Sequence, residues 1–450
     1  MREDAVVEVI RYDEAVIQYG NHLCRKYTSE HHAAQVRAQL RAFGKLILTA
    51  KEIDSSVSNM YDLLDARNVP LIIEAINKIA GLDSKTGLYR APATDTSLGT
   101  ELKRICKLLQ MEFIKTNDRE NLKRMKNLMT VFEVEFNVTI NKKGVESQKI
   151  IKRRKKTILP KTEVIGQFRN FLESKIGFYI GQLEREYSKA DWIKLAEYTL
   201  VHLAVFNRKR PGETQRILIE DYKHYEVLEE NEMENEDLIS KEQSKKWARI
   251  KFTGKLGNDN ALLVHRDLGF KAINLILKYR EEAGVDKSNR YIFGEPSQYH
   301  AQKTFQACSL IRKLSEESGI PNSELMRTRL LRQHLATETA SHNIDSKLEN
   351  RLSDFMAHNR KIHDVHYVLT KKKDDIMKVS TLLENFSSTK NLPSTSCNSE
   401  NMAENNRLSN SEPTTSNVEE ESNYELSSCS DSENEEENLS QAEINLILGK

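Results

Sequence analysis

The sequence predicts a mainly α-helical protein with a small β-sheet, organised as a helical first domain, an α+β second domain and a disordered acidic tail. Apolar residues recur at three- and four-residue steps along most of the chain before Phe386, which is typical of amphipathic helices. One segment, residues 247–264, instead alternates around a turn and predicts a β-hairpin. Beyond Phe386 the chain is rich in Ser, Asn and Glu. It has too few apolar residues there to offset the entropy of ordering.

The charge distribution divides the chain in the same way. The 450 residues include 68 basic and 67 acidic side chains. Residues 387–450 hold 13 acidic and 3 basic residues, so this tail carries −10 and residues 1–386 carry +11. The positive body favours a polyanionic partner. The tail is a candidate for binding a protein partner, for which its last apolar segment, AEINLIL, could form a short helix.

Several classes of protein are disfavoured by composition. No stretch of about 18 apolar residues occurs and the N-terminus lacks an apolar signal core, so we expect an intracellular protein without membrane spans. The five cysteines lie far apart without a C-x-x-C pair, which argues against a zinc finger or a disulfide framework. We expect neither a metal nor a cofactor.

Residues 1–140 predict a small helical domain. Val36, Leu40, Phe43 and Ile47 form an apolar stripe, and further helical patterns cover Val69–Ala80 and Leu98–Ile114. On a neighbouring face of the first helix lies a second, basic stripe, made of Arg37, Arg41 and Lys45. This stripe is a candidate for phosphate contacts, although a solvated helix face explains it equally well.

Residues 141–162 are interpreted as a basic linker, because a run of five basic residues stands there between polar residues and a proline. The run consists of Lys152, Arg153, Arg154, Lys155 and Lys156. Such a cluster is able to contact phosphates or serve as a nuclear-import signal, and a solvated connector is the alternative.

Residues 163–378 predict the larger α+β domain, and residues 379–450 the disordered tail. A helical face from Trp192 to Leu203 is followed by Pro211, which is typical of the first position of a new helix. After the hairpin, helical patterns resume at Leu268–Glu282, Ala301–Ser318 and Leu330–Ser341.

Two parts of this domain have residues suited to binding a phosphate. Arg210 stands at the mouth of the helix that Pro211 opens, with Glu213 in its first turn, and a guanidinium there offers paired donors to an anion. Arg329 and Arg332 lie three residues apart on a predicted helix and share a face. Taken singly, the first is equally a capped helix and the second a salt-bridged one.

Three further residues have side chains suited to proton transfer or nucleophilic attack. Lys255 lies at the tip of the predicted hairpin, where it could donate a proton to a leaving oxygen. His358 follows the apolar pair Phe355-Met356, and Tyr367 comes nine residues later. The alternatives are a turn lysine, a helix-capping histidine and a tyrosine at the edge of the core.

In chain order these residues run Arg, Lys, Arg-x-x-Arg, His and Tyr, and this order resembles the tyrosine recombinase, or phage-integrase, superfamily. Within it, the form Leu-Leu-Arg-Gln-His-Leu-Ala-Thr is similar to recombinases of Crypton-type transposable elements. The likeness is strong over residues 190–370 and looser over the N-terminal domain, which would be the core-binding domain. The matching positions are Arg210-x-x-Glu213, the hairpin Lys255, Arg332, Met356-Ala357-His358 and Tyr367.

The resemblance implies a metal-free DNA breaking and rejoining reaction. Tyr367 would attack a DNA phosphate to form a 3′-phosphotyrosine link, and Arg210 and Arg332 would hold the phosphate oxygens. Lys255 would protonate the 5′-hydroxyl leaving group, with His358 as an additional donor. Arg329 departs from the family, which often has His or Lys there. It can donate hydrogen bonds to a phosphate but cannot act as a base.

The resemblance also implies double-stranded DNA as partner, a tetramer on DNA and nuclear localisation. Two alternatives stay open. One is a domesticated, catalytically inactive DNA-binding or chromatin protein, to which Arg329 and the acidic tail point. The other is a type IB topoisomerase, which resembles the recombinases in chemistry but relaxes supercoils as a monomer.

Overall fold

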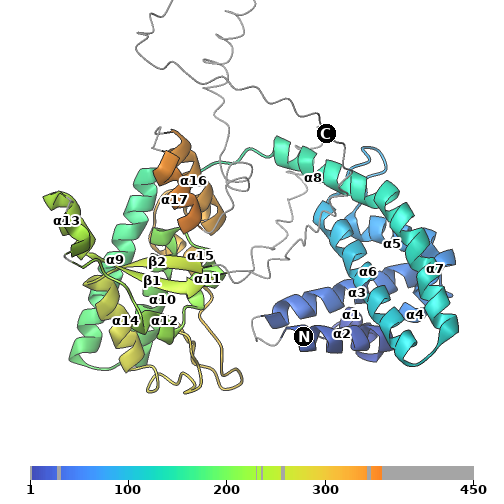
Figure 1. Ribbon diagram of the computed structural model, residues 1–450, viewed down its shortest axis with the longest axis horizontal. Coiled ribbons are helices and arrows are strands. Elements are labelled where there is room, and N and C mark those ends of the chain that lie inside the picture. Colours follow the sequence, from blue (N-terminus) through green and yellow to red (C-terminus); the bar gives the residue numbers. More distant parts are fainter. Residues whose placement is uncertain are drawn as a thin grey trace, which may run out of the picture.

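The computed structural model describes residues 3–27, 32–229, 231–234, 237–254, 259–341 and 346–356. Within these ranges the chain forms two lobes, each with its own hydrophobic core (Figure 1). Both are dominated by helices, and a two-stranded antiparallel sheet lies in the second lobe. The predicted fold class, mainly α with a small β-sheet, is therefore confirmed. The predicted acidic tail, 379–450, lies outside the described residues.

The first lobe is a helical bundle. Its core is made by the apolar faces of the long helices, and the predicted stripe residues Val36, Phe43 and Ile47 are buried there. The helix expected over Val69–Ala80 has those bounds as α5, and Gly81 ends it in the left-handed region. The elements of the lobe are α1 (Ala5–Tyr12), α2 (Glu14–Lys26), α3 (Ala33–Ile53), α4 (Met60–Leu63), η2 (Ala66–Asn68), α5 (Val69–Ala80), α6 (Pro92–Lys115), α7 (Arg119–Phe136), η3 (Asn137–Asn141) and α8 (Lys142–Arg154).

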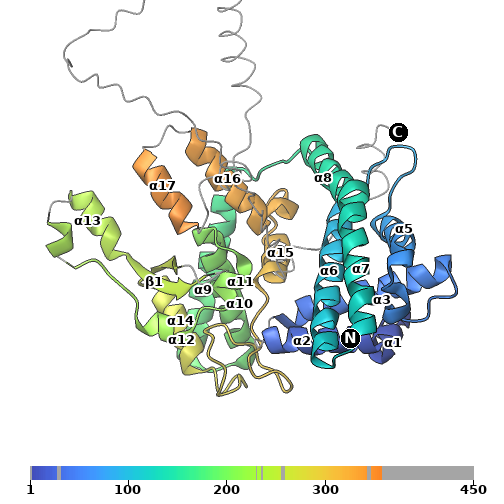
Figure 2. The same cartoon turned by 45° about the vertical axis from the view of Figure 1, so that its right-hand side comes forward.

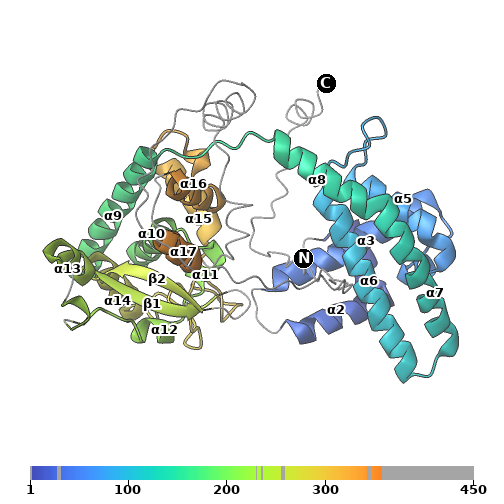
Figure 3. The same ribbon diagram turned by 45° about the horizontal axis from the view of Figure 1, so that its top comes forward.

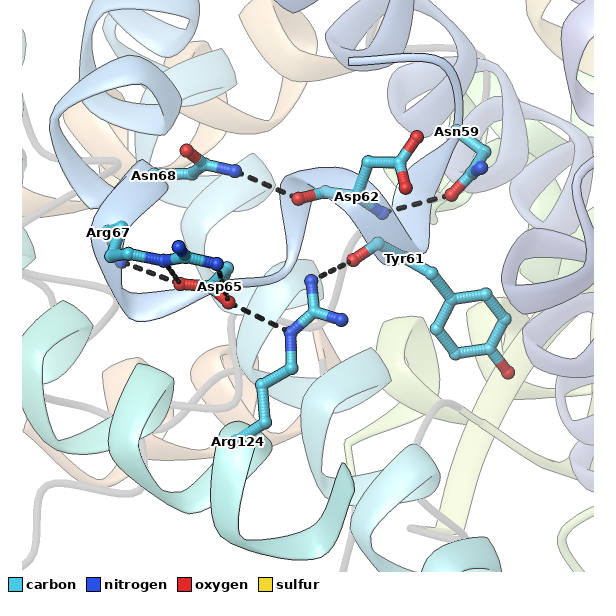
Figure 4. A network of polar contacts seen from close by, with 7 residues as sticks. All are labelled: Asn59, Tyr61, Asp62, Asp65, Arg67, Asn68 and Arg124. Atoms are coloured by element: carbon cyan, nitrogen blue, oxygen red, sulfur yellow. Dashed lines mark hydrogen bonds and ion pairs between the residues drawn. The ribbon is translucent and has the colours of Figure 1, made fainter. Parts of the chain in front are cut away.

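A polar network fixes the corner between α4 and α7. Asp65 accepts hydrogen bonds from the backbone and guanidinium of Arg67, and Arg124 pairs with the same carboxylate at 3.1 Å (Figure 4). Arg124 also donates to the backbone carbonyl of Tyr61. The hydrogen bonds from Arg67, more than the charge of Arg124, lower the pKa of Asp65 to about 2.

The stretch interpreted as a linker is helical over much of its length. A π-helical turn, η3, joins α7 to α8, so the chain continues as helix up to Arg154. The helix persists because Gly144 and Ser147 are buried against the first lobe: Ser147 accepts from the Tyr89 backbone N–H at 3.1 Å. Residues 155–161 then cross to the second lobe without regular structure, as Figure 3 shows.

The second lobe packs helices around α10, whose side chains are buried almost all round. Trp192 is fully buried and its indole N–H donates to the Ile276 carbonyl at 3.0 Å. The elements are α9 (Thr162–Arg185), α10 (Lys189–Asn207), α11 (Pro211–Gln215), α12 (Ile219–Lys223), η4 (Asn231–Met233), α13 (Leu238–Lys245), β1 (Trp247–Thr253), β2 (Asp259–His265), α14 (Leu268–Lys278), α15 (Ala307–Glu317), η6 (Ser323–Leu325), α16 (Thr328–Ser341) and α17 (Ser346–Phe355).

The predicted hairpin is present. Strand β1 pairs antiparallel with β2 in a register that sets Trp247 opposite His265 and Thr253 opposite Asp259. Buried and exposed residues alternate along β1, since one face packs on the core. Helices α16 and α17 lie side by side at one end of the lobe in both Figure 1 and Figure 2.

Candidate active site

The first predicted phosphate-binding element is built at the junction of α10 and α11. Arg208 ends α10 in the left-handed region, at φ 53°, and turns the chain toward Pro211, the first residue of α11. Arg210 is the residue before this helix and its guanidinium lies 2.9 Å from the Glu213 carboxylate. A quarter of the Arg210 side chain remains exposed, whereas Glu213 is nearly buried. Arg210 and Glu213, the two ends of the Arg-x-x-Glu motif, therefore form an ion pair at the start of α11.

A hydrogen-bonded chain extends this pair to the turn end of the hairpin, where Asn260 pairs with Phe252. The other carboxylate oxygen of Glu213 accepts from the Asn260 side-chain amide at 3.2 Å. The Asn260 carbonyl oxygen accepts in turn from the Lys209 ammonium at 2.5 Å. Asn260 lies one residue inside β2, so the hairpin is tied to the arginine through polar side chains. Neither Lys209 nor Asn260 was among the predicted site residues.

Arg332 reaches the same junction from α16. Its side chain is buried, and its guanidinium donates to the Arg208 carbonyl at 2.8 Å and to the Met356 carbonyl at 3.1 Å. It therefore links the end of α10 to the end of α17. Arg329, one turn earlier on α16, is exposed. The two arginines have different surroundings, and a phosphate contact by Arg329 stays a prediction.

Cations gather around this junction, and burial changes their acidity. Burial lowers the pKa of Lys209 to about 7; Glu213 opposes this shift, and Arg332, Arg210 and Arg249 reinforce it. Burial, aided by Arg169, also lowers the pKa of Arg208 to about 10. A site that holds several partly desolvated cations beside one carboxylate is suited to binding an anion.

The remaining catalytic candidates lie outside the described residues. These are Lys255 between the two strands, and His358 and Tyr367 after α17. Their roles stay predictions. The structure does describe the residues that border them: Thr253 and Asp259 pair at the end of the hairpin, and Met356 contacts Arg332 two residues before His358 in the sequence.

The candidate DNA-binding residues are distributed over two helices. On α3, Arg37 and Lys45 are exposed, while the Arg41 guanidinium is paired with Asp4, with 2.5 Å between Nη2 and Oδ2. The five residues of the basic run at the end of α8 and just beyond it are all exposed: Lys152, Arg153, Arg154, Lys155 and Lys156.

The described part of the chain offers neither a metal centre nor a membrane span. No group of three or more His, Cys, Asp and Glu side chains gathers in these ranges. None of the described helices is long and apolar enough to cross a membrane. Cys24, Cys106 and Cys308, the cysteines within the described ranges, are not joined in disulfides.

Comparison with known proteins gives structural likenesses at low sequence identity. No protein-family model and no curated protein matches the chain. Among solved structures, the XerH site-specific recombinase bound to a palindromic difH substrate, in a post-cleavage complex, is 16% identical, with a TM-score of 0.42 over 77% of this chain and 78% of that one. The XerH pre-cleavage complex with difH is 14% identical, with a TM-score of 0.34 over 85% and 98% of the two chains.

Proposed function

We propose that this protein cleaves and rejoins DNA strands through a 3′-phosphotyrosine intermediate, as the recombinase of a Crypton-like element. The observation that supports this most directly is the meeting of Arg210, Glu213 and Arg332 at one junction. Arg332 lies more than a hundred positions after Arg210 and Glu213 in the sequence, yet it donates to the carbonyl of Arg208, two residues before Arg210.

In the proposed mechanism, the protein stabilises the charge that develops on a DNA phosphate. Arg210 has an exposed portion and is held by Glu213, so it presents donors to the non-bridging oxygens. Arg332 is the second donor to the phosphate, and Arg329 and His358 are additional donors. Tyr367 supplies the nucleophilic oxygen and Lys255 the proton for the departing 5′-oxygen. Attack by another 5′-hydroxyl on the phosphotyrosine then restores the strand without ATP.

Binding of the duplex is proposed to use both lobes. The exposed basic run from Lys152 to Lys156 lies where α8 leaves the first lobe, and Arg37 and Lys45 are exposed on α3. Neutralising several phosphates in this way makes affinity fall steeply as salt concentration rises. We further propose assembly as a tetramer on DNA and nuclear import through the basic run.

One observation favours the second candidate, a non-cleaving DNA-binding protein with the same fold. Two nitrogens of Arg332 donate to main-chain carbonyls of the protein itself, at Arg208 and Met356. A guanidinium held this way has fewer donors left for a phosphate. An inactive descendant would keep such structural contacts and lose strand cleavage.

A covalent-adduct assay separates the two candidates. Full-length protein is incubated with a pool of nicked DNA duplexes, and protein–DNA adducts that survive denaturant are collected. The recombinase forms adducts, the Tyr367→Phe variant binds DNA equally well and forms none, and Tyr299→Phe, an exposed tyrosine, serves as the matched control. DNA binding without any adduct would establish the second candidate. Plasmid relaxation without recombinant products would instead indicate a type IB topoisomerase.

A further inference from the structure

Lys209 is a completely buried lysine, which is rare unless the ammonium is well paired. Its ammonium donates to Asn260 and to the backbone carbonyl of Phe355, and it lies 3.8 Å from the centre of the Phe355 ring. The lysine is therefore held between the turn end of the hairpin and the last residue of α17. None of the steps in the proposed mechanism requires it.

The end of α17 receives two cations. Lys209 binds the carbonyl of Phe355, and Arg332 binds the carbonyl of Met356, the next residue. Carbonyls in the last turn of a helix have no partner within that helix and carry partial negative charge, so cations stabilise them. The two side chains come from different elements, the α10–α11 junction and α16. Lys209 directly precedes Arg210 in the chain, and Arg332 donates to the carbonyl of Arg208, two residues before Arg210.

We propose that Lys209 is a positioning residue that, together with Arg332, holds the C-terminal end of α17 against the Arg210–Glu213 pair. This inference rests on the proposed function, since it matters to catalysis only if the residues that follow Met356 act on the phosphate. His358 follows the bound Met356 carbonyl two residues later in the sequence, and these contacts hold the last described residues before it. Asn260 aligns the ammonium by accepting one of its hydrogens.

The surroundings of Lys209 make this contact sensitive to pH. Glu213 on α11 stabilises the ammonium, while Arg210, Arg332 and Arg249 on the neighbouring elements disfavour it. With a pKa of about 7, Lys209 is charged below neutrality and loses its charge above it. The charged form makes the stronger hydrogen bond to a carbonyl. Positioning of α17 should therefore weaken as pH rises through neutrality.

The experiment compares wild-type, Lys209→Met and Lys223→Met full-length proteins. Methionine keeps the length of the side chain and removes the donor. Lys223 is exposed on α12, 62% by side-chain area, and serves as the matched control. We expect Lys209→Met to bind the nicked duplexes within about twofold of wild type and to form adducts about 10- to 100-fold more slowly, the size of effect that misplaced catalytic groups produce.

The pH profile distinguishes positioning from a purely structural role. The ratio of wild-type to Lys209→Met cleavage rates should fall as pH rises from about 6 to about 8, since the wild type alone loses the charge of Lys209 there. Equal cleavage rates in the two proteins, or a rate ratio that is constant over this range, would overturn the proposal.

Hydrogen–deuterium exchange tests the same contact without catalysis. The amide of Met356, which donates to the Leu352 carbonyl, should exchange at least tenfold faster in Lys209→Met, and the amides of α10 should not change. Absence of adducts in wild type with faster exchange in the variant would refute the proposed function and retain the contact. Unchanged exchange would overturn the contact itself.

A milder variant covers the case in which Lys209→Met does not fold. Phe355→Leu removes the ring beneath the ammonium and leaves the backbone carbonyl in place. We expect a smaller loss of cleavage rate, about two- to tenfold, and faster exchange at Met356. A wild-type cleavage rate together with a wild-type exchange rate at Met356 in Phe355→Leu would contradict the proposal.

Discussion

Replacing Arg332 by lysine tests whether this arginine supports the structure of the second lobe. The guanidinium bridges two carbonyls, at 2.8 Å and 3.1 Å, from two different elements. Lysine keeps the charge but concentrates its donors at one point, so it cannot reproduce both contacts. A hydrogen bond to a charged group contributes about 1.5–3 kcal/mol, and a carbonyl left buried without a donor costs a similar amount. We expect Arg332→Lys to lower the free energy of unfolding by about 2–3 kcal/mol.

Tryptophan fluorescence during urea unfolding measures this loss in the relevant lobe. The chain has two tryptophans, Trp192 in α10 and Trp247 in β1, and both belong to the second lobe. Arg329→Lys is the control: it makes the same substitution one turn earlier on α16 at an exposed site, and should change stability by less than about 0.5 kcal/mol. If Arg332→Lys proved as stable as wild type, Arg332 would be a ligand-binding residue without a structural role.

Three further predictions concern the first lobe and can be checked by calorimetry across pH. Asp95 is fully buried, and burial raises its pKa to about 7. The folded state therefore binds one more proton than the unfolded state between about pH 4 and 7, and the free energy of unfolding falls as pH rises through this range. Asp95→Asn should remove this loss and stabilise the protein at pH 8 by about 2 kcal/mol. Gly144→Ala should destabilise the first lobe, since the new Cβ would lie 2.4 Å from an Asp95 oxygen. Gly166→Ala, on α9 of the second lobe, is the control: its Cβ meets nothing within 4 Å, and it should stabilise the protein by up to about 1 kcal/mol. The pKa of Asp65 is lowered to about 2, so its contribution to the free energy of unfolding is complete above about pH 4 and is lost as pH falls toward 2. In Asp65→Asn, stability should therefore depend less on pH between about pH 4 and 2. An unchanged pH–stability curve in either aspartate variant, or equal effects of the two alanines, would contradict the corresponding prediction.

Local sequence signals predicted the elements whose stability is local. Apolar periodicity was enough to give the bounds of α5, and Pro211 marked the start of α11. The helix expected from Ala301 to Ser318 begins only at Ala307. The preceding residues pair instead with a nearby segment in an antiparallel arrangement, through a bridge between Gly294 and Thr304. Such backbone pairing overrides a helical pattern, and apolar periodicity does not reveal it.

The site was predictable where one motif holds both partners and not where distant elements meet. Arg210 and Glu213 are three residues apart, so their pairing follows from helix geometry. Lys209 stands in a basic run, Arg-Lys-Arg, that reads as a solvated face, and nothing adjacent indicates its burial. Its partners lie some fifty residues ahead at Asn260 and nearly 150 ahead at Phe355. Contacts of that range come from tertiary packing, which periodicity does not encode.

The buried cations at the α10–α11 junction are more readily explained by binding than by stability. Desolvation lowers the pKa of both Lys209 and Arg208, which means that folding works against their charged forms. Glu213 divides its two oxygens between Arg210 and Asn260, so it offsets only part of this cost. An anion placed beside Arg210 would be attracted by each of these cations. The same groups whose charged forms folding disfavours would then stabilise a bound phosphate, and perturbed acidity concentrated at one junction is typical of a functional site.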